Sequence, residues 1–109
     1  MPKFMFQASY TPMGAKALAR EGGSKRRGAV GAAIEALGGR MESFYYAFGS
    51  RDVVVIADLP DNVSSVALTL AINQTGLVTA STVVLITADE MDRAAKKGVR
   101  HRAPGQKKR

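Results

Sequence analysis

Two runs of aromatic and β-branched residues, separated by a short turn, constrain the fold of this chain more than any other feature. The runs are Met41–Phe48 and Val53–Asp58, and the segment between them is Gly49-Ser50-Arg51-Asp52. Aromatic and β-branched side chains favour a packed, pleated surface, whereas glycine, serine and aspartate favour turns. Pro60 ends the second run. The stretch therefore predicts a β-hairpin, to which the other elements must attach.

One strand and two helical segments are expected before the hairpin. Alternating apolar residues predict a strand over residues 3–10. Thr11 is a natural N-cap for a short helix that runs to about Arg20, with Pro12 in its first turn. After Gly22-Gly23, Ser24 caps a second, longer segment with apolar residues at helical spacing as far as Leu37.

After Pro60 the pattern predicts a helix, a strand and a final helix. Asp61 or Asn62 caps the first helix, the strand spans residues 78–87, and Thr87 caps a polar helix over residues 88–97. The apolar positions of the first of these helices share one stripe, which consists of Val63, Val66, Ala67, Leu70 and Ala71. Without the last helix the order is β-α-β-β-α-β, which predicts an α+β, ferredoxin-like fold with a four-stranded antiparallel sheet and both main helices on one face.

The strands carry apolar residues on both faces, although a sheet covered on one side should alternate between apolar and polar. The predicted faces of the second strand are Phe44, Tyr46 and Phe48 on one side and Met41, Tyr45 and Ala47 on the other. The third strand is apolar throughout from Val53 to Ala57. A bare apolar sheet would aggregate, so we expect a homodimer in which two copies pack sheet against sheet.

Composition excludes several kinds of site. The chain has 109 residues, enough for one domain, and it has no Cys and a single His, His101. A disulfide framework, a Cys- or His-ligated metal and a Ser-His-Asp triad are therefore not expected, and we predict no cofactor. No apolar run reaches the ~20 residues of a membrane span, and the N-terminus lacks the layout of a signal peptide. We therefore expect a cytoplasmic protein.

Positive charge is concentrated at the C-terminus. The net charge of +7 consists of −1 over residues 1–92 and +8 over residues 93–109. We expect a folded domain over residues 1–97 and a disordered basic tail over residues 98–109. Such a tail either binds nucleic acid or anionic lipid non-specifically or acts as a solubilising extension. The candidate nucleic-acid-binding residues are Arg100, Arg102, Lys107, Lys108 and Arg109.

Several segments of the chain resemble the GYD-domain family. They are Ser9-Tyr-Thr-Pro-Met-Gly-Ala15, Glu21-Gly-Gly-Ser24, Leu37-Gly-Gly39, Glu42-Ser-Phe-Tyr-Tyr-Ala-Phe-Gly49 and Asp52-Val-Val-Val-Ile56. The likeness covers residues 3 to about 97. At the hairpin turn Gly49 and Asp52 fit the pattern, whereas Ser50-Arg51 stands where an aromatic residue is usual.

The resemblance implies a small dimeric α/β-barrel protein. The wider group includes cofactor-free monooxygenases, haem-degrading enzymes, isomerases and dehalogenases, which use a cavity between sheet and helices. The GYD-like proteins themselves are largely uncharacterised. Transfer of one of these chemistries to this chain would rest on fold analogy alone, so whether it is an enzyme stays open.

Tyrosines form the most suggestive polar group in the predicted strands. Tyr10, Tyr45 and Tyr46 either line a pocket with their hydroxyls aimed at a ligand or are ordinary aromatics of the core or the dimer interface. The second interpretation is favoured. Because Tyr45 and Tyr46 are adjacent in a strand, they point to opposite faces and cannot share one site.

Two carboxylates and one amide are further candidates. Asp52 and Asp58 are either general bases facing the cavity, with pKa values raised by burial, or a turn cap and a solvent-exposed group, respectively. The structural interpretation is favoured for both. Asn73 either lines the pocket or faces solvent near a helix end. The predicted ligand-binding residues are Tyr10, Tyr46, Asp52 and Asn73, of which Asp52 and Tyr46 are also the catalytic candidates.

A cluster of cations follows Gly22-Gly23. Ser24, Lys25, Arg26 and Arg27 lie at a predicted helix N-terminus, where free N–H groups and positive charge can hold a phosphate or carboxylate. The spacing is not that of a P-loop, and solvated cations beside a flexible bend are the favoured interpretation.

The sequence thus predicts a dimer that binds a small organic molecule between sheet and helices, with or without chemistry on it. The alternative is a nucleic-acid- or anion-binding protein that acts through its basic tail.

Overall fold

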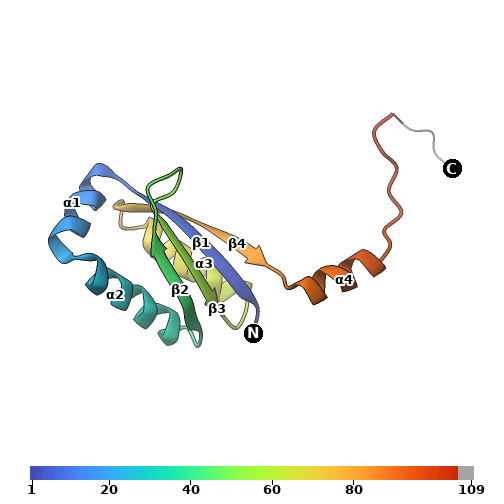
Figure 1. Cartoon of the computed structure of the whole chain (residues 1–109), viewed down its shortest axis with the longest axis horizontal. Helices are drawn as coiled ribbons and strands as arrows, with labels where there is room; N and C mark the ends of the chain where they lie inside the picture. The colour runs from blue at the N-terminus through green and yellow to red at the C-terminus, as the bar shows by residue number, and fades with distance from the viewer. Residues whose placement is uncertain (106–109) are drawn as a thin grey trace.

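The computed structural model describes residues 1–105. Its central element is a four-stranded antiparallel sheet (Figure 1). The strands are β1 (Lys3–Tyr10), β2 (Arg40–Tyr46), β3 (Val53–Asp58) and β4 (Val78–Leu85). Their order across the sheet is β2-β3-β1-β4, so the hairpin β2–β3 lies on one side of β1 and β4 lies on the other. This arrangement confirms the predicted α+β fold and fits a ferredoxin-like topology.

Four helices connect and follow the strands. They are α1 (Pro12–Glu21), α2 (Gly23–Ala36), α3 (Asn62–Asn73) and α4 (Ala88–Lys96). The first three lie against the sheet, whereas α4 extends away from it after β4 (Figure 1). Among the described residues after α4, no helix or strand follows. The expected disorder of the tail stays a prediction, and residues 106–109 lie outside the described part of the chain.

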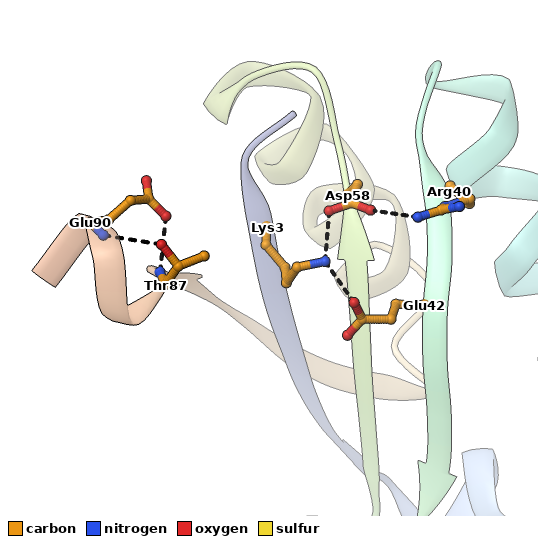
Figure 2. Close-up of polar contacts among 6 residues, drawn as sticks. All are labelled: Lys3, Arg40, Glu42, Asp58, Thr87 and Glu90. Carbon is orange, nitrogen blue, oxygen red and sulfur yellow. Dashed lines mark hydrogen bonds and ion pairs between the residues drawn. The ribbon is translucent and has the colours of Figure 1, made fainter.

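Side-chain caps start three of the helices where the sequence predicts them. The Thr11 hydroxyl accepts a hydrogen bond from the Gly14 N–H at 3.1 Å, and the Asp61 carboxylate accepts one from the Ser64 N–H at 2.8 Å. Thr87 and Glu90 form a reciprocal capping box at the start of α4 (Figure 2). The prediction for α2 is wrong by two residues, because Gly22, at φ 97°, takes the cap position instead of Ser24.

The core lies between the helices and the face of the sheet that they cover. Phe4, Phe6 and Val55 alternate along the central strands and pack against Ile34 of α2 and Leu68 of α3. Each large apolar side chain buried in this way contributes about 1.5–3 kcal/mol to folding. The layer of helices is therefore anchored to β1 and β3, the two central strands.

The apolar stripe of α3 does not face the sheet. Val63 and Leu70 are 78% and 56% exposed, whereas Ser65 and Leu68 are buried. Polar contacts explain this orientation of the helix. The hydroxyl of Thr69 forms a hydrogen bond with that of Thr82 in β4, and Asn73 binds the backbone of the same strand. Because the row of positions 65, 69 and 73 faces β4, the more apolar stripe is turned towards solvent.

A bulge changes the predicted faces of β2. The register shifts between Met41, which pairs with Ala57, and Ser43, which pairs with Ile56. Met41 consequently packs against the core instead of sharing a face with Tyr45, as predicted from unbroken alternation. Phe48 was also misplaced, because β2 ends at Tyr46 and the Phe48 side chain is 100% exposed in the turn.

No helix within the described chain covers the other face of the sheet (Figure 1). Met5, Val54, Ile56 and Val83 alternate with the core-facing residues of β1, β3 and β4. We call this surface, together with Tyr45 of β2, the open face. Its apolar character agrees with the pattern expected from the sequence, in which the strands are apolar on both sides.

Charged residues form a network at one end of the open face (Figure 2). Lys3 of β1 contacts Asp58 of β3 at 2.8 Å and Glu42 of β2 at 2.7 Å, and Arg40 lies 3.5 Å from Asp58. The Lys3 hydrogen bond is the main cause that lowers the pKa of Asp58, and the same bond raises the pKa of Lys3. The network ties three strands together, and its two positive and two negative charges balance.

Candidate functional site

A cavity of about 260 Å³ lies between the covered face of the sheet and helices α1, α2 and α3. Its floor includes Phe6, Val53 and Val55 of the sheet. Many of the helix residues that line the cavity are small, and their side chains are too short to reach the sheet. They are Gly14, Ala17, Ala29, Ala33 and Ala71. The cavity therefore exists because alanine and glycine stand where a tightly packed interface would carry larger side chains.

The walls of the cavity are almost entirely apolar, and its polar side chains come from Tyr10, Glu21, Arg26 and Thr75. Tyr10 is the last residue of β1, Glu21 the last of α1, and Arg26 lies in the first turns of α2. Because the chain bends between α1 and α2 at Gly22, the two charged residues come together, with their nearest side-chain nitrogen and oxygen atoms 3.6 Å apart (Figure 1). We call Tyr10, Glu21, Arg26 and the adjacent Tyr46 the polar end of the cavity.

Tyr46 closes this end from β2. Its hydroxyl donates a hydrogen bond to the Gly23 carbonyl at 3.0 Å, and its ring packs on Gly23, where an added Cβ would lie 3.0 Å from the ring. The ring of Tyr46 also contacts Phe44 edge-on, with centroids 5.1 Å apart. The start of α2 is thus fastened to the sheet beside the cavity.

Both phenols at the polar end are neutral at physiological pH. Burial, reinforced by the neighbouring Tyr46, raises the pKa of Tyr10 to about 12, although Arg26 opposes the shift. Burial also raises the pKa of Tyr46, against opposing effects of Tyr10 and Arg26. Neutral phenols donate and accept hydrogen bonds, so the two hydroxyls are suited to orient a polar group of a ligand.

Asp52 lies beside the site without lining the cavity. Its carboxylate accepts a hydrogen bond from the Tyr10 N–H at 2.9 Å, and its own N–H donates to the Ala8 carbonyl at 2.8 Å. These contacts join the hairpin turn to the end of β1 and match the turn-capping interpretation. Through the backbone of Tyr10, Asp52 holds that tyrosine in position.

Asn73 does not line the cavity either, and its side chain binds the backbone of Ala80, a residue that does. Its amide nitrogen donates to the Ala80 carbonyl at 3.2 Å, and its amide oxygen accepts from the Ala80 N–H at 2.7 Å. The side chain therefore satisfies both polar groups of one residue of β4. The predicted ligand-binding set is thus divided: Tyr10 lines the cavity, Tyr46 lies next to Tyr10, and Asp52 and Asn73 make supporting contacts.

The predicted anion-binding cluster is divided as well. Arg26 lines the cavity, whereas Ser24, Lys25 and Arg27 are exposed. Arg26 could have been singled out from the sequence, because it precedes Ala29, Val30 and Ala33 by three, four and seven positions and so shares their helical face. Glu21 and Thr75 were not among the predicted site residues, although Glu21 stands three positions after the cavity-lining Leu18.

The remaining candidates lie away from the cavity. Asp58 belongs to the ion network of the open face, and Tyr45 points away from Tyr46 and is 70% exposed. Arg100 and Arg102 are exposed, whereas Lys107, Lys108 and Arg109 lie outside the described residues. The alternative function through the tail therefore stays a prediction from the sequence. In the part of the chain that the structure describes, no helix combines the length and the hydrophobicity that crossing a membrane requires.

Comparison with known proteins identifies the domain by its family. Neither the curated proteins nor the solved structures contain a match to this chain. The family model of the GYD domain, in contrast, matches residues 4–95. This match spans β2–β4, the helices α1–α3 and all but one residue each of β1 and α4. The chain therefore belongs to the GYD-domain family.

Proposed function

We propose that this protein binds a small, largely apolar organic molecule in the cavity between sheet and helices. The observation that carries this proposal is the cavity's asymmetry: apolar side chains line nearly all of it, and three of its polar residues, Tyr10, Glu21 and Arg26, lie close to one another. Pockets that combine apolar walls with a few convergent polar groups are typical of small-molecule sites. A volume of about 260 Å³ suits a single-ring or short-chain compound.

Tyr10 and Tyr46 have the central role in this proposal. Their neutral hydroxyls fix the orientation of the ligand's polar group, and Asp52 keeps Tyr10 in place through its backbone. The apolar walls with few polar groups support binding, which is therefore the activity that we propose.

Filling the cavity tests this function directly. Ala33 lines the cavity, whereas the adjacent Ala32 is exposed and does not line it. We expect Ala33→Leu to weaken binding of a compound such as para-butylphenol by at least about tenfold, because the added side chain occupies the ligand's space. Isothermal titration calorimetry measures this loss, and a compound first identified by native mass spectrometry extends the test to a natural ligand.

Ala32→Leu is the matched control for this experiment. It introduces the same side chain on the same helix and should leave the affinity unchanged, while both variants keep the melting temperature of the unliganded protein within a few degrees. Equal binding by the Ala33→Leu variant and the unaltered protein would contradict the proposed site.

We further propose that two copies of the chain associate through the open face. This surface carries apolar side chains next to the polar Gln7 and Ser81, and no helix of the described chain covers it (Figure 1). Exposed apolar patches rimmed by polar residues mark interaction sites. The adjacent Lys3–Asp58–Glu42–Arg40 network is already internally paired, so covering it would leave no unpaired charge in the interface.

Ile56→Lys tests the dimer by placing a charge in the middle of the open face. We expect the dissociation constant to rise roughly a hundredfold or more, since an unpaired buried charge costs several kcal/mol. Sedimentation equilibrium measures the shift from two chains to one. Val63→Lys is the control, because Val63 lies on α3 and is 78% exposed. A monomeric unaltered protein at micromolar concentration would refute the proposal.

A further inference from the structure

The charged residues at the polar end indicate the chemical class of the ligand, which the proposed function leaves open. This inference rests on that proposed function. Arg26 and Glu21 are the charged side chains among the described residues that line the cavity. Each side chain is about 40% exposed, so both reach from solvent to the cavity wall. Any ligand polar group held by the two tyrosines lies beside this pair.

The pairing of Arg26 with Glu21 is weak. Their nearest nitrogen and oxygen atoms are 3.6 Å apart, longer than a hydrogen bond between charged groups. A half-exposed pair at this distance stabilises a protein little, because water screens it. The guanidinium has five N–H donors, so most of its donor capacity is left for another acceptor.

Arg26 also lies near both phenols. Its positive charge acts to lower the pKa values of Tyr10 and Tyr46, whereas burial raises both. The Tyr46 hydroxyl is committed to the Gly23 carbonyl at 3.0 Å. The Tyr10 hydroxyl is hydrogen-bonded to Tyr46. The guanidinium is therefore the group at this end of the apolar cavity that has N–H donors left for an acceptor with negative charge.

We infer that the ligand of this cavity is a small organic monocarboxylate. Its apolar part occupies the space above Phe6 and Val55, and its carboxylate accepts hydrogen bonds from Arg26 in the planar, paired geometry that guanidinium and carboxylate share. A phosphate dianion fits less well, because its second charge would meet the Glu21 carboxylate with a single cation to balance both. A cationic ligand would be repelled by the positive charge of Arg26.

A pair of compounds that differ in charge alone tests this inference. Para-butylbenzoate and para-butylbenzamide have nearly the same shape, and at neutral pH only the benzoate is charged. We expect the full-length protein to bind the benzoate roughly tenfold or more tightly, as measured by isothermal titration calorimetry, because the benzamide cannot form a charged pair with Arg26.

Variants of the two charged residues should change this preference in opposite directions. Arg26→Gln should abolish the tenfold preference for the benzoate. Arg27→Gln is the matched control, since Arg27 is exposed and does not line the cavity, and it should keep the preference. Glu21→Gln should strengthen benzoate binding several-fold, because it removes both the competing partner of Arg26 and a repulsive charge.

The outcomes separate this inference from the proposed function. Equal affinity for benzoate and benzamide in the unaltered protein would overturn the carboxylate assignment and leave the cavity as a binding site. A preference that persists in the Arg26→Gln variant would also overturn it. Failure of both compounds to bind would refute the proposed function, and the carboxylate assignment with it.

Discussion

Gly14→Ala is expected to destabilise the protein by at least about 3 kcal/mol, because the added methyl group would collide with fixed backbone. A Cβ at Gly14 would lie 1.8 Å from the Leu77 carbonyl oxygen. That carbonyl cannot easily move, since it accepts hydrogen bonds from the N–H and the hydroxyl of Thr11 at 3.0 and 3.2 Å. The substitution therefore forces α1 away from the segment that leads into β4.

The loss should be visible in both stability and binding. Urea denaturation at a fixed protein concentration measures the free energy of unfolding, and fixed concentration matters if the folded protein is a dimer. Because Gly14 and Leu77 both line the cavity, ligand affinity should fall along with stability.

Gly28→Ala is the matched control for this prediction. Gly28 lies inside α2, and no atom would come within 4 Å of a Cβ added there. The same substitution should therefore stabilise the protein, by about 0.5–1 kcal/mol, because alanine loses less conformational freedom in a helix than glycine. Similar effects of the two substitutions would show that the approach of α1 to Leu77 is not as close as described.

Phe6→Ala should cost about 3–5 kcal/mol of unfolding free energy, because it removes a large buried side chain from the centre of the sheet. Phe6 is 3% exposed and belongs both to the core and to the floor of the cavity. The truncation therefore enlarges a space that already exists, and the surrounding strands, which are hydrogen-bonded on both sides of β1, cannot collapse to fill it.

Phe48→Ala provides the comparison, since Phe48 is 100% exposed in the hairpin turn and should change stability by less than about 0.5 kcal/mol. Ligand size gives a second readout for Phe6→Ala, because a larger cavity should accept a bulkier compound. A loss of less than about 1 kcal/mol in the free energy of unfolding of the Phe6→Ala variant would be too small for truncation of a buried phenylalanine. The assignment of Phe6 to the core would then be wrong.

Local sequence signals were sufficient for the order of the elements and for most of their ends. The strand periods, the proline at position 60 and the caps at Thr11, Asp61 and Thr87 each act within a few residues, and the structure confirms them. The GYD family could likewise be recognised from short segments. The candidate site was predicted in part, because Tyr10 and Arg26 line the cavity and Tyr46 lies beside it. Asp52 and Asn73 do not line it and instead bind the backbone of two lining residues, Tyr10 and Ala80.

Long-range contacts decided what the local pattern could not. Unbroken alternation placed Met41 on the open face, but a bulge set by pairing with β3 turns it into the core. The stripe at Val63 and Leu70 looked like the packing face of α3, but hydrogen bonds from Thr69 and Asn73 to β4 rotate the helix the other way.

The sequence by itself determined the α+β fold, the family and the apolar character of both sheet faces, because periodicity and turn residues act locally. Only the tertiary structure determined where the cavity lies and that Glu21 and Arg26 meet at its polar end. The physical reason is that a cavity is a mismatch between surfaces: small residues on α1, α2 and α3 leave space only once those helices are held at a set distance from the sheet.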